Sequence, residues 1–216
     1  MKDMQRIAID GPGGAGKSTV AKLVARELDI DYVDTGAMYR AVAYKALQKH
    51  IPPGDETALA DMLADTDIDF SDGNIMLDGN VVDREIRTPE VSSAASDWSA
   101  YRAVREKLVA LQRNMGERKS IVMDGRDIGT NVLKDAEHKF FLTASAEERA
   151  RRRYKELRDK GQEVKYEDVL KDIEERDRND TTRKLNPLKK ALDAVEIDTT
   201  GMTIEAVVKK ILEEIR

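Results

Sequence analysis

The stretch RIAIDGPGGAGKS, residues 6–18, decides the fold of this chain. Residues 6–10 form a short apolar run, which is typical of a buried parallel strand. Residues 11–18 match the pattern G-x-x-x-x-G-K-[ST], and apolar side chains at helical spacing follow over residues 17–28. A strand, a glycine-rich loop and a helix in this order predict a loop whose N–H groups surround phosphate oxygens. The alternative is a glycine-rich turn that carries an incidental lysine.

Each part of this loop has a physical role. The glycines permit close approach of the backbone, Lys17 can reach β- and γ-phosphates, and the Ser18 hydroxyl can ligate Mg²⁺. The residues expected to bind the nucleotide are Gly11, Pro12, Gly13, Gly14, Ala15, Gly16, Lys17, Ser18 and Thr19. The motif therefore predicts a nucleoside triphosphate site, and it leaves open a GTPase switch, an ATP-driven motor or a small-molecule kinase.

Composition narrows the class of protein. A length of 216 residues predicts one domain, and the absence of cysteine, with only two histidines, excludes disulfide scaffolds, zinc–thiolate sites and multi-histidine metal sites. No apolar run reaches 18 residues and the N-terminus has no signal-peptide core, so we expect a cytoplasmic protein with no membrane partner. The net charge of −5 argues against nucleic-acid binding.

Strands are predicted over residues 6–10, 32–33, 121–123, 139–142 and 195–198, and they alternate with helices. This order predicts an α/β fold of three layers with a five-stranded parallel sheet. Residues 57–100 break the alternation, because short extended pieces at 68–70, 74–77 and 80–82 are separated by hairpin-turn residues. We expect one domain with a core of residues 1–56, 101–145 and 190–216 and a small antiparallel sheet inserted at about 57–100.

Two further motifs lie where ligands bind an open parallel sheet, beyond the carboxyl ends of strands. Residues 34–40, DTGAMYR, follow the second strand, and Arg40 lies one helical turn in, where it can bind phosphate through a fork of N–H groups. Residues 124–129, DGRDIG, follow another strand, so Asp124 can hold a metal-bound water while Arg126 and Asp127 are exposed by the loop. The alternatives are an ordinary helix start with a surface arginine and a loop ion pair.

The third feature is a basic segment, since residues 145–190 hold 15 Lys and Arg against 12 Asp and Glu. Two arginine-bearing helices joined by a glycine-containing loop indicate a lid, at about 149–165 within a helical segment 145–185, that closes over phosphates. Helical spacing lets Arg149, Arg152 and Arg153 share a face. A solvated, charge-laced pair of helices is the alternative.

Taken together, these motifs resemble those of bacterial cytidylate kinases, in the nucleoside monophosphate kinase family, over essentially the whole chain. The matching stretches are GPGGAGKS, DTGAMYR, EIRTPEVSSAAS, DGRDIGT, SAEERARRR and ERDRNDTTR. The chain departs from many members at Thr35, where they carry serine, and both side chains supply a hydroxyl. The resemblance implies a P-loop fold with a helical lid, and the insertion at 57–100 is similar to the NMP-binding lobe of the long bacterial members.

The resemblance also implies an activity, in which the γ-phosphate of ATP passes to CMP or dCMP with Mg²⁺ in pyrimidine metabolism. The chain would act as a monomer on small molecules. The residues that match the family's acceptor site are Asp34, Thr35, Tyr39, Arg40, Ser96, Arg105, Arg126, Asp127, Arg176, Asp180 and Arg183. Among them, Ser96, Arg105 and Asp127 match positions that recognise cytosine, and Asp180 and Arg176 match ribose contacts.

Further roles implied by the resemblance are catalytic. Lys17, Arg126, Arg176 and Arg183 would stabilise the transferring group, Arg152 and Arg153 would contact ATP, and Ser18 and Asp124 (through water) would hold the metal. A nucleoside monophosphate is anionic at neutral pH, so this transfer needs positioning and positive charge and no general base. A P-loop kinase for another acceptor, such as AMP or shikimate, and a non-catalytic nucleotide-binding switch remain as alternatives.

Overall fold

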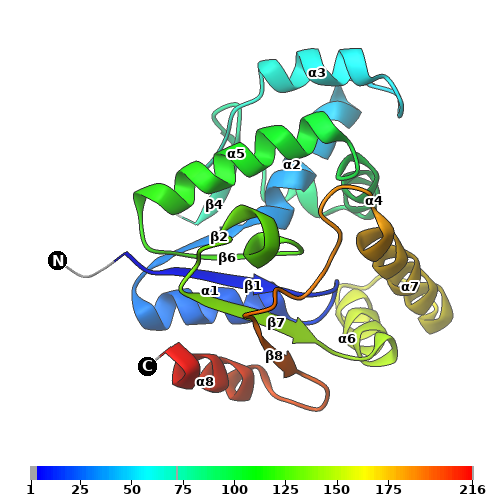
Figure 1. The fold of residues 1–216 in the computed structure, drawn as a ribbon. Helices are drawn as coiled ribbons and strands as arrows, with labels where there is room; N and C mark the ends of the chain where they lie inside the picture. The colour runs from blue at the N-terminus through cyan, green and yellow to red at the C-terminus, as the bar shows by residue number, and fades with distance from the viewer. Residues whose placement is uncertain (1–3, 72, 216) are drawn as a thin grey trace. The chain divides into compact units, whose positions relative to one another are not determined.

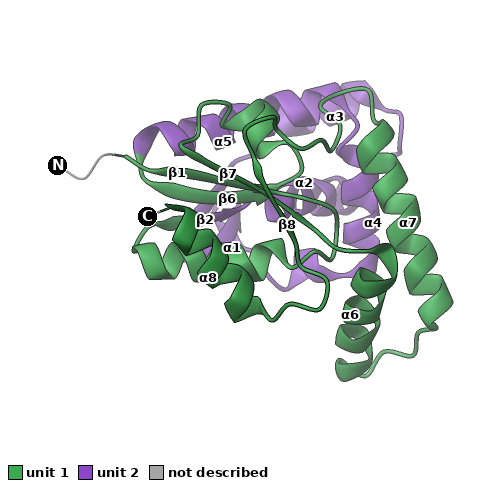
Figure 2. Cartoon of the chain, turned by 60° about the horizontal axis from the view of Figure 1, so that its bottom comes forward, with its two compact units in different colours: residues 1–32, 119–216 green, residues 33–118 purple. Residues whose placement is uncertain are grey.

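The computed structural model describes residues 4–71 and 73–215 and divides the chain into two compact units. The first unit comprises residues 1–32 and 119–216, and the second comprises residues 33–118 (Figure 2). The predicted division into a core and an insertion at 57–100 stays a prediction. Among the described residues, every helix is too short or too polar to cross a membrane.

A five-stranded sheet with strand order β2-β6-β1-β7-β8 forms the centre of the α/β fold (Figure 1). Its strands are β1 (Arg6–Asp10), β2 (Asp31–Asp34), β6 (Ile121–Gly125), β7 (His138–Thr143) and β8 (Val195–Asp198). β1 pairs in parallel with both β6 and β7, and β7 pairs in parallel with β8. The predicted parallel sheet is therefore confirmed, and its carboxyl ends lie at the same edge as the loop at residues 11–16.

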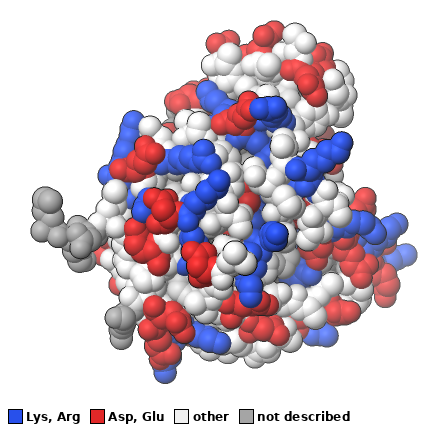
Figure 3. All heavy atoms as spheres, viewed as in Figure 1, with Lys and Arg blue, Asp and Glu red and all other residues white. Residues whose placement is uncertain are grey.

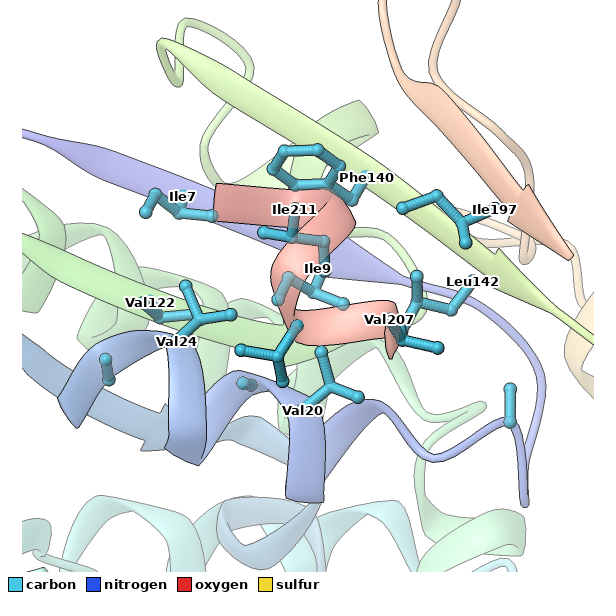
Figure 4. Close-up of a cluster of buried hydrophobic side chains, with 14 residues drawn as sticks. Ile7, Ile9, Val20, Val24, Val122, Phe140, Leu142, Ile197, Val207 and Ile211 are labelled. Carbon is cyan, nitrogen blue, oxygen red and sulfur yellow. The ribbon is translucent and has the colours of Figure 1, made fainter. Parts of the chain in front are cut away.

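Apolar packing holds the first unit together. The helices of this unit are α1 (Lys17–Leu28), α6 (Ala146–Asp159), α7 (Tyr166–Thr182) and α8 (Ile204–Ile215). Figure 4 shows strand residues such as Ile9, Phe140 and Leu142 packed with Val20 of α1 and Ile211 of α8. Burial of each such side chain contributes about 1.5–3 kcal/mol, which explains why the helical stripes face the sheet.

The second unit contains the predicted small antiparallel sheet. Its elements are α2 (Thr35–Gln48), α3 (Glu56–Ala64), β3 (Ile68–Ser71), β4 (Asn74–Leu77), β5 (Asn80–Val81), η1 (Glu85–Arg87), α4 (Pro89–Trp98) and α5 (Arg102–Arg118). Asp78 and Gly79 both have positive φ, as a two-residue hairpin turn requires. Lys45 on α2 binds the Asp65 carbonyl at 2.8 Å and the Asp78 carboxylate at 2.6 Å, and so ties this sheet to the helix.

Two elements differ from the prediction. Helix α3 lies in a segment for which no helix was predicted, and residues 128–132, expected as loop, form a short π-helix, η2 (Ile128–Val132). The N–H of Leu133 donates to the Ile128 carbonyl at 2.7 Å, five residues back, which defines the wider turn. At its start, the N–H groups of Ile128 and Gly129 each donate to the Asp10 carboxylate at 2.8 Å. This long-range pairing overrides the local sequence.

Gly11 lies tightly against the backbone of β7. Its φ is +148°, and a Cβ placed there would lie 2.0 Å from the Leu142 carbonyl oxygen of β7. We expect Gly11→Ala to lower the free energy of unfolding by at least about 3 kcal/mol, measured by urea denaturation, because backbone would have to move.

Gly201→Ala is the matched control. Gly201 also has positive φ (+69°), but a Cβ there meets no atom within 4 Å, so the expected loss is only about 1 kcal/mol. Equal losses in the two variants would show that steric contact with β7 is not what requires glycine at position 11.

Candidate active site

The loop between β1 and α1 carries the first group of predicted site residues. Gly14 and Gly16 have positive φ, and Gly16 is the N-cap of α1, so N–H groups of the loop and the helix start lie together. The Lys17 ammonium donates to the Pro12 carbonyl at 2.7 Å. Burial, together with the nearby positive charge of Arg126, lowers the pKa of Lys17 to about 7. A polyanion would relieve this concentration of positive charge.

Two arginines from other elements lie beside the same loop. A Cβ built on Gly13 would be 3.5 Å from a terminal nitrogen of Arg126 and 3.6 Å from Cδ of Arg176. Arg126 follows β6 and Arg176 lies on α7, so three separate segments bring cationic side chains to the loop. The first unit therefore brings Lys17, Arg126 and Arg176 together beside the loop.

A carboxylate and a hydroxyl meet at the start of α1. The Ser18 hydroxyl donates to one oxygen of Asp124 at 2.8 Å, and the Tyr32 hydroxyl donates to the other at 2.7 Å. Asp124 is only 4% exposed. Hydroxyl and carboxylate oxygens are the ligands that Mg²⁺ prefers, and Mg²⁺ typically takes one or two protein ligands beside substrate phosphates. The donor set therefore fits the predicted metal site, and Tyr32 is an addition that sequence reasoning missed.

Four predicted residues form a buried network of ion pairs after β6 and at the end of α7. Arg126 Nε donates to Asp180 at 2.7 Å, and Arg183 donates to Asp127 at 3.0 Å. Asn131 donates to the other oxygen of Asp127 at 3.0 Å. Burial alone would raise the pKa of Asp180, but Arg126, Arg176 and Arg183 together outweigh it, so the pKa lies below its usual range. The network holds both arginines in fixed positions.

Asp10 fixes the segment that carries two of these residues. Its carboxylate is 4% exposed and accepts the N–H groups of Ile128 and Gly129, directly after Arg126 and Asp127. Burial raises the pKa of Asp10 to about 6, although these two hydrogen bonds favour the charged form. Sequence reasoning missed this role; the available signal was an acidic residue at the end of an apolar strand.

The lid arginines have different partners. Arg149 is bidentate to Asp177 of α7 at 2.9 and 2.5 Å, and it also donates to the carbonyls of Gly13 at 3.0 Å and Ala144 at 2.9 Å. Arg152 binds the carbonyl and hydroxyl oxygens of Thr199 at 2.7 and 3.1 Å. Arg153 pairs with Glu156 at 2.9 Å on the helix surface. Arg149 thus joins α6, α7 and the phosphate-binding loop, a role that its spacing did not reveal.

Exposed arginines of α6 lie among acidic side chains. Arg151 pairs with Glu148 at 2.5 Å, and Lys160 pairs with Glu156 at 2.5 Å. Figure 3 shows the same interspersion of both signs of charge over the visible face of the molecule. Within residues 145–190, Arg149 is the one buried basic residue, and most of the others are exposed among acidic side chains rather than gathered in a broad basic surface.

The second unit holds the remaining predicted residues. Asp34 caps α2 by accepting the Ala37 N–H at 2.8 Å, and its other oxygen accepts from Arg40 at 3.1 Å. A Cβ on Gly36 would lie 3.1 Å from the Arg40 guanidinium, which folds back over the helix start. Thr35 is buried at the same turn. The motif at 34–40 therefore forms one compact, arginine-bearing helix N-terminus.

Two of the three residues predicted to recognise the base lie on helices of this unit. The guanidinium of Arg105, on α5, lies 5.9 Å from the centre of the Tyr39 ring, on α2, and is only 3% exposed. Ser96 is half-buried on α4, where its carbonyl accepts from the Ser99 hydroxyl at 2.7 Å. The packing of α2 with both α4 and α5 thus gathers these predicted residues within the second unit.

Comparison with known proteins places the chain in a family. The family model described as cytidylate kinase matches residues 7–216. The chain belongs to the cytidylate kinase family. It is 52% identical over 209 residues to a cytidylate kinase of Clostridioides difficile, with 97% of each chain covered. It is also 52% identical over 211 residues to one of Caldicellulosiruptor bescii, with 96% of this chain and 93% of the relative covered.

Solved structures support the fold assignment. A shikimate kinase from Bacteroides thetaiotaomicron superposes with a TM-score of 0.52 at 15% identity, with 98% of each chain covered. A gluconokinase from Sinorhizobium meliloti gives a TM-score of 0.51 at 15% identity over 97% of this chain and 90% of its own. These likenesses show the P-loop kinase fold that the sequence predicted. Membership of the cytidylate kinase family makes the chain a kinase, and the family implies the use of ATP.

The Arg149–Asp177 contact generates a prediction about stability. The Arg149 side chain is 5% exposed, so removing its carboxylate partner leaves a buried charge uncompensated. We expect a double-mutant cycle with Arg149→Met and Asp177→Ala, measured by urea denaturation, to give a coupling energy of about 1–3 kcal/mol.

The control cycle uses Arg153→Ala and Glu156→Ala on the same helix. This pair is 40% and 47% exposed, and solvent screening should limit its coupling energy to about 0.5 kcal/mol. A coupling for Arg149 and Asp177 no larger than the control value would contradict the assigned role.

Proposed function

We propose that this chain transfers the γ-phosphate of ATP to CMP or dCMP and releases ADP with CDP or dCDP. The observation that carries the proposal is the convergence of Lys17, Arg126 and Arg176 on the phosphate-binding loop. A transferring phosphoryl group spreads negative charge over its oxygens, and fixed positive charges stabilise it most where water is excluded. The 52% identity to cytidylate kinases over nearly the whole chain supports the choice of acceptor.

On the donor side, the proposal assigns the phosphates of ATP to the backbone N–H groups of residues 11–19 and to Lys17. Ser18, and Asp124 through water, would hold Mg²⁺, which neutralises phosphate charge when it is bound. Arg152 and Arg153 are proposed to contact ATP from α6, which forms the lid together with α7. Their present partners, Thr199 and Glu156, would then have to be exchanged for phosphate oxygens.

On the acceptor side, the proposal assigns the CMP phosphate to Thr35, Arg40 and Arg126 and to the loop of Asp34. Tyr39 is proposed as a further CMP-binding residue. The cytosine would be recognised by Ser96, Arg105 and Asp127, and the ribose by Asp180 and Arg176. Asp127 already accepts from Arg183 and Asn131. A carboxylate has about four acceptor sites, so it can still accept the N4 amino group of cytosine.

Catalysis in this proposal needs no titrating base. The phosphate oxygen of CMP is already anionic at neutral pH, so attack requires alignment and charge neutralisation. Asp180 and Asp127 already hold the guanidinium groups of Arg126 and Arg183 in place. This preorganisation lowers the free energy needed to reach the transition state. We also propose that the chain acts as a cytoplasmic monomer whose partners are small molecules, with CMP-binding residues in the insertion at 57–100.

An acceptor panel tests the proposal. With ATP and Mg²⁺, ADP release in a coupled assay should depend on CMP or dCMP and be much weaker with UMP. Uracil presents an acceptor where cytosine presents the N4 donor, so Asp127→Ala should lower the CMP-over-UMP ratio of kcat/KM by about 5- to 150-fold, equivalent to about 1–3 kcal/mol.

Asp135→Ala, at a side chain that is 78% exposed, is the matched control and should leave the ratio unchanged. A full CMP-over-UMP ratio in Asp127→Ala would remove Asp127 from base recognition. Activity with AMP or shikimate but not CMP would overturn the proposed acceptor, and ATP binding without acceptor-dependent ADP release would favour a nucleotide-binding switch.

Lys17→Ala tests the catalytic centre. The variant should fold, since the Lys17 ammonium binds the protein through its hydrogen bond to the Pro12 carbonyl, while its turnover should fall by about 10²-fold or more. Steady-state kcat with CMP and a thermal melt measure the two effects. Lys209→Ala, an exposed lysine on α8, should retain the parental rate, and a parental rate in Lys17→Ala would exclude Lys17 from the mechanism.

A further inference from the structure

Tyr32 contributes a hydroxyl to the carboxylate that the proposed function assigns to Mg²⁺. Its OH donates to Asp124 Oδ1 at 2.7 Å, while the Ser18 hydroxyl donates to Oδ2 at 2.8 Å. We infer that Tyr32 is a positioning residue that locks the Asp124 carboxylate in the orientation needed by Ser18. The inference rests on the proposed function for the identity of the metal and extends it to a residue outside every motif described above.

The orientation of the carboxylate decides what Ser18 can do. A hydroxyl that donates its hydrogen to Oδ2 keeps its oxygen lone pairs for a cation. The torsion that rotates a carboxylate is broad and weakly restrained by itself. A hydrogen bond to Oδ1 from Tyr32 removes this freedom, so Oδ2 stays directed at Ser18.

The surroundings of Tyr32 suit this task. The ring is half-buried in β2, the neighbour of β6, which carries Asp124. The Lys22 ammonium lies 5.6 Å from the ring centre, and Lys22 is on α1, one turn after Ser18. The phenol thus spans from β6 to the helix that carries Ser18.

Tyr32→Phe removes only the hydroxyl and keeps the ring. The probe is ADP, whose dissociation constant is measured by calorimetry without metal and with saturating Mg²⁺. In the parental protein Mg²⁺ should tighten ADP binding. In Tyr32→Phe this enhancement should shrink by roughly tenfold, as is typical for a partner that orients a metal ligand. The metal-free dissociation constant should stay within about twofold, because the Tyr32 hydroxyl binds the Asp124 carboxylate, which is assigned to the metal and not to the phosphates.

A double-mutant cycle identifies the route of the effect. If Tyr32 acts through Asp124, then Tyr32→Phe should have no further effect in an Asp124→Asn background. Tyr44→Phe is the matched control, since Tyr44 also uses its hydroxyl in a 2.7 Å hydrogen bond, with Gln48, on an exposed face of α2. This control should preserve the Mg²⁺ enhancement.

Kinetics supply an independent readout. The Mg²⁺ concentration that gives half-maximal rate should rise in Tyr32→Phe, while kcat at saturating Mg²⁺ changes less. The inference is overturned if the enhancement is unchanged, if metal-free ADP binding weakens equally, if the effect persists in Asp124→Asn, or if Mg²⁺ has no effect on the parental protein. Failure of the proposed function is seen separately, as a parental protein that releases no CMP-dependent ADP.

Discussion

Charge buried at the carboxyl ends of β1 and β6 is the constraint on which the first unit depends. An ionised group removed from water is costly unless it is paired or hydrogen-bonded. Asp10 therefore accepts hydrogen bonds from two backbone N–H groups, and Arg126 forms an ion pair with Asp180. These requirements shape the backbone, because the turn after β6 widens into η2 where its N–H groups meet Asp10. The geometry of the site follows from the need to compensate these charges.

The same pairing explains how arginines can be held still and yet remain suited to a phosphate. Arg126 commits Nε to Asp180, while a terminal nitrogen lies beside Gly13. The guanidinium therefore has one edge for its structural partner and one edge toward the loop. A planar group with five donors permits this division of labour, and a lysine, with one point charge, would not. Preorganisation and charge compensation are consequently supplied by the same contacts.

The strands and helices of the core were predicted well because their signals come from residues that are adjacent in the chain. The apolar run at 6–10, the glycine loop and the helical stripe at 17–28 lie side by side in the chain, and all three elements are confirmed. The prediction missed what depends on distant partners. Asp10 meets residues more than a hundred positions away, and Arg149 meets Asp177 on another helix. The role of Tyr32 was missed for the same reason, since no residue near Tyr32 in the chain indicates that its hydroxyl meets Asp124.

Arg149 has a consequence for how the sequence can drift over evolutionary time. It stands in a run, RARRR, in which each arginine looks interchangeable with its neighbours. Its four hydrogen bonds to Ala144, Gly13 and Asp177 require the planar, forked guanidinium group. Lysine would keep the positive charge but could not form these bonds in the same directions. Arg151, by contrast, forms a surface pair with Glu148, which lysine can replace at little cost. Selection should therefore restrict position 149 to arginine more strongly than position 151.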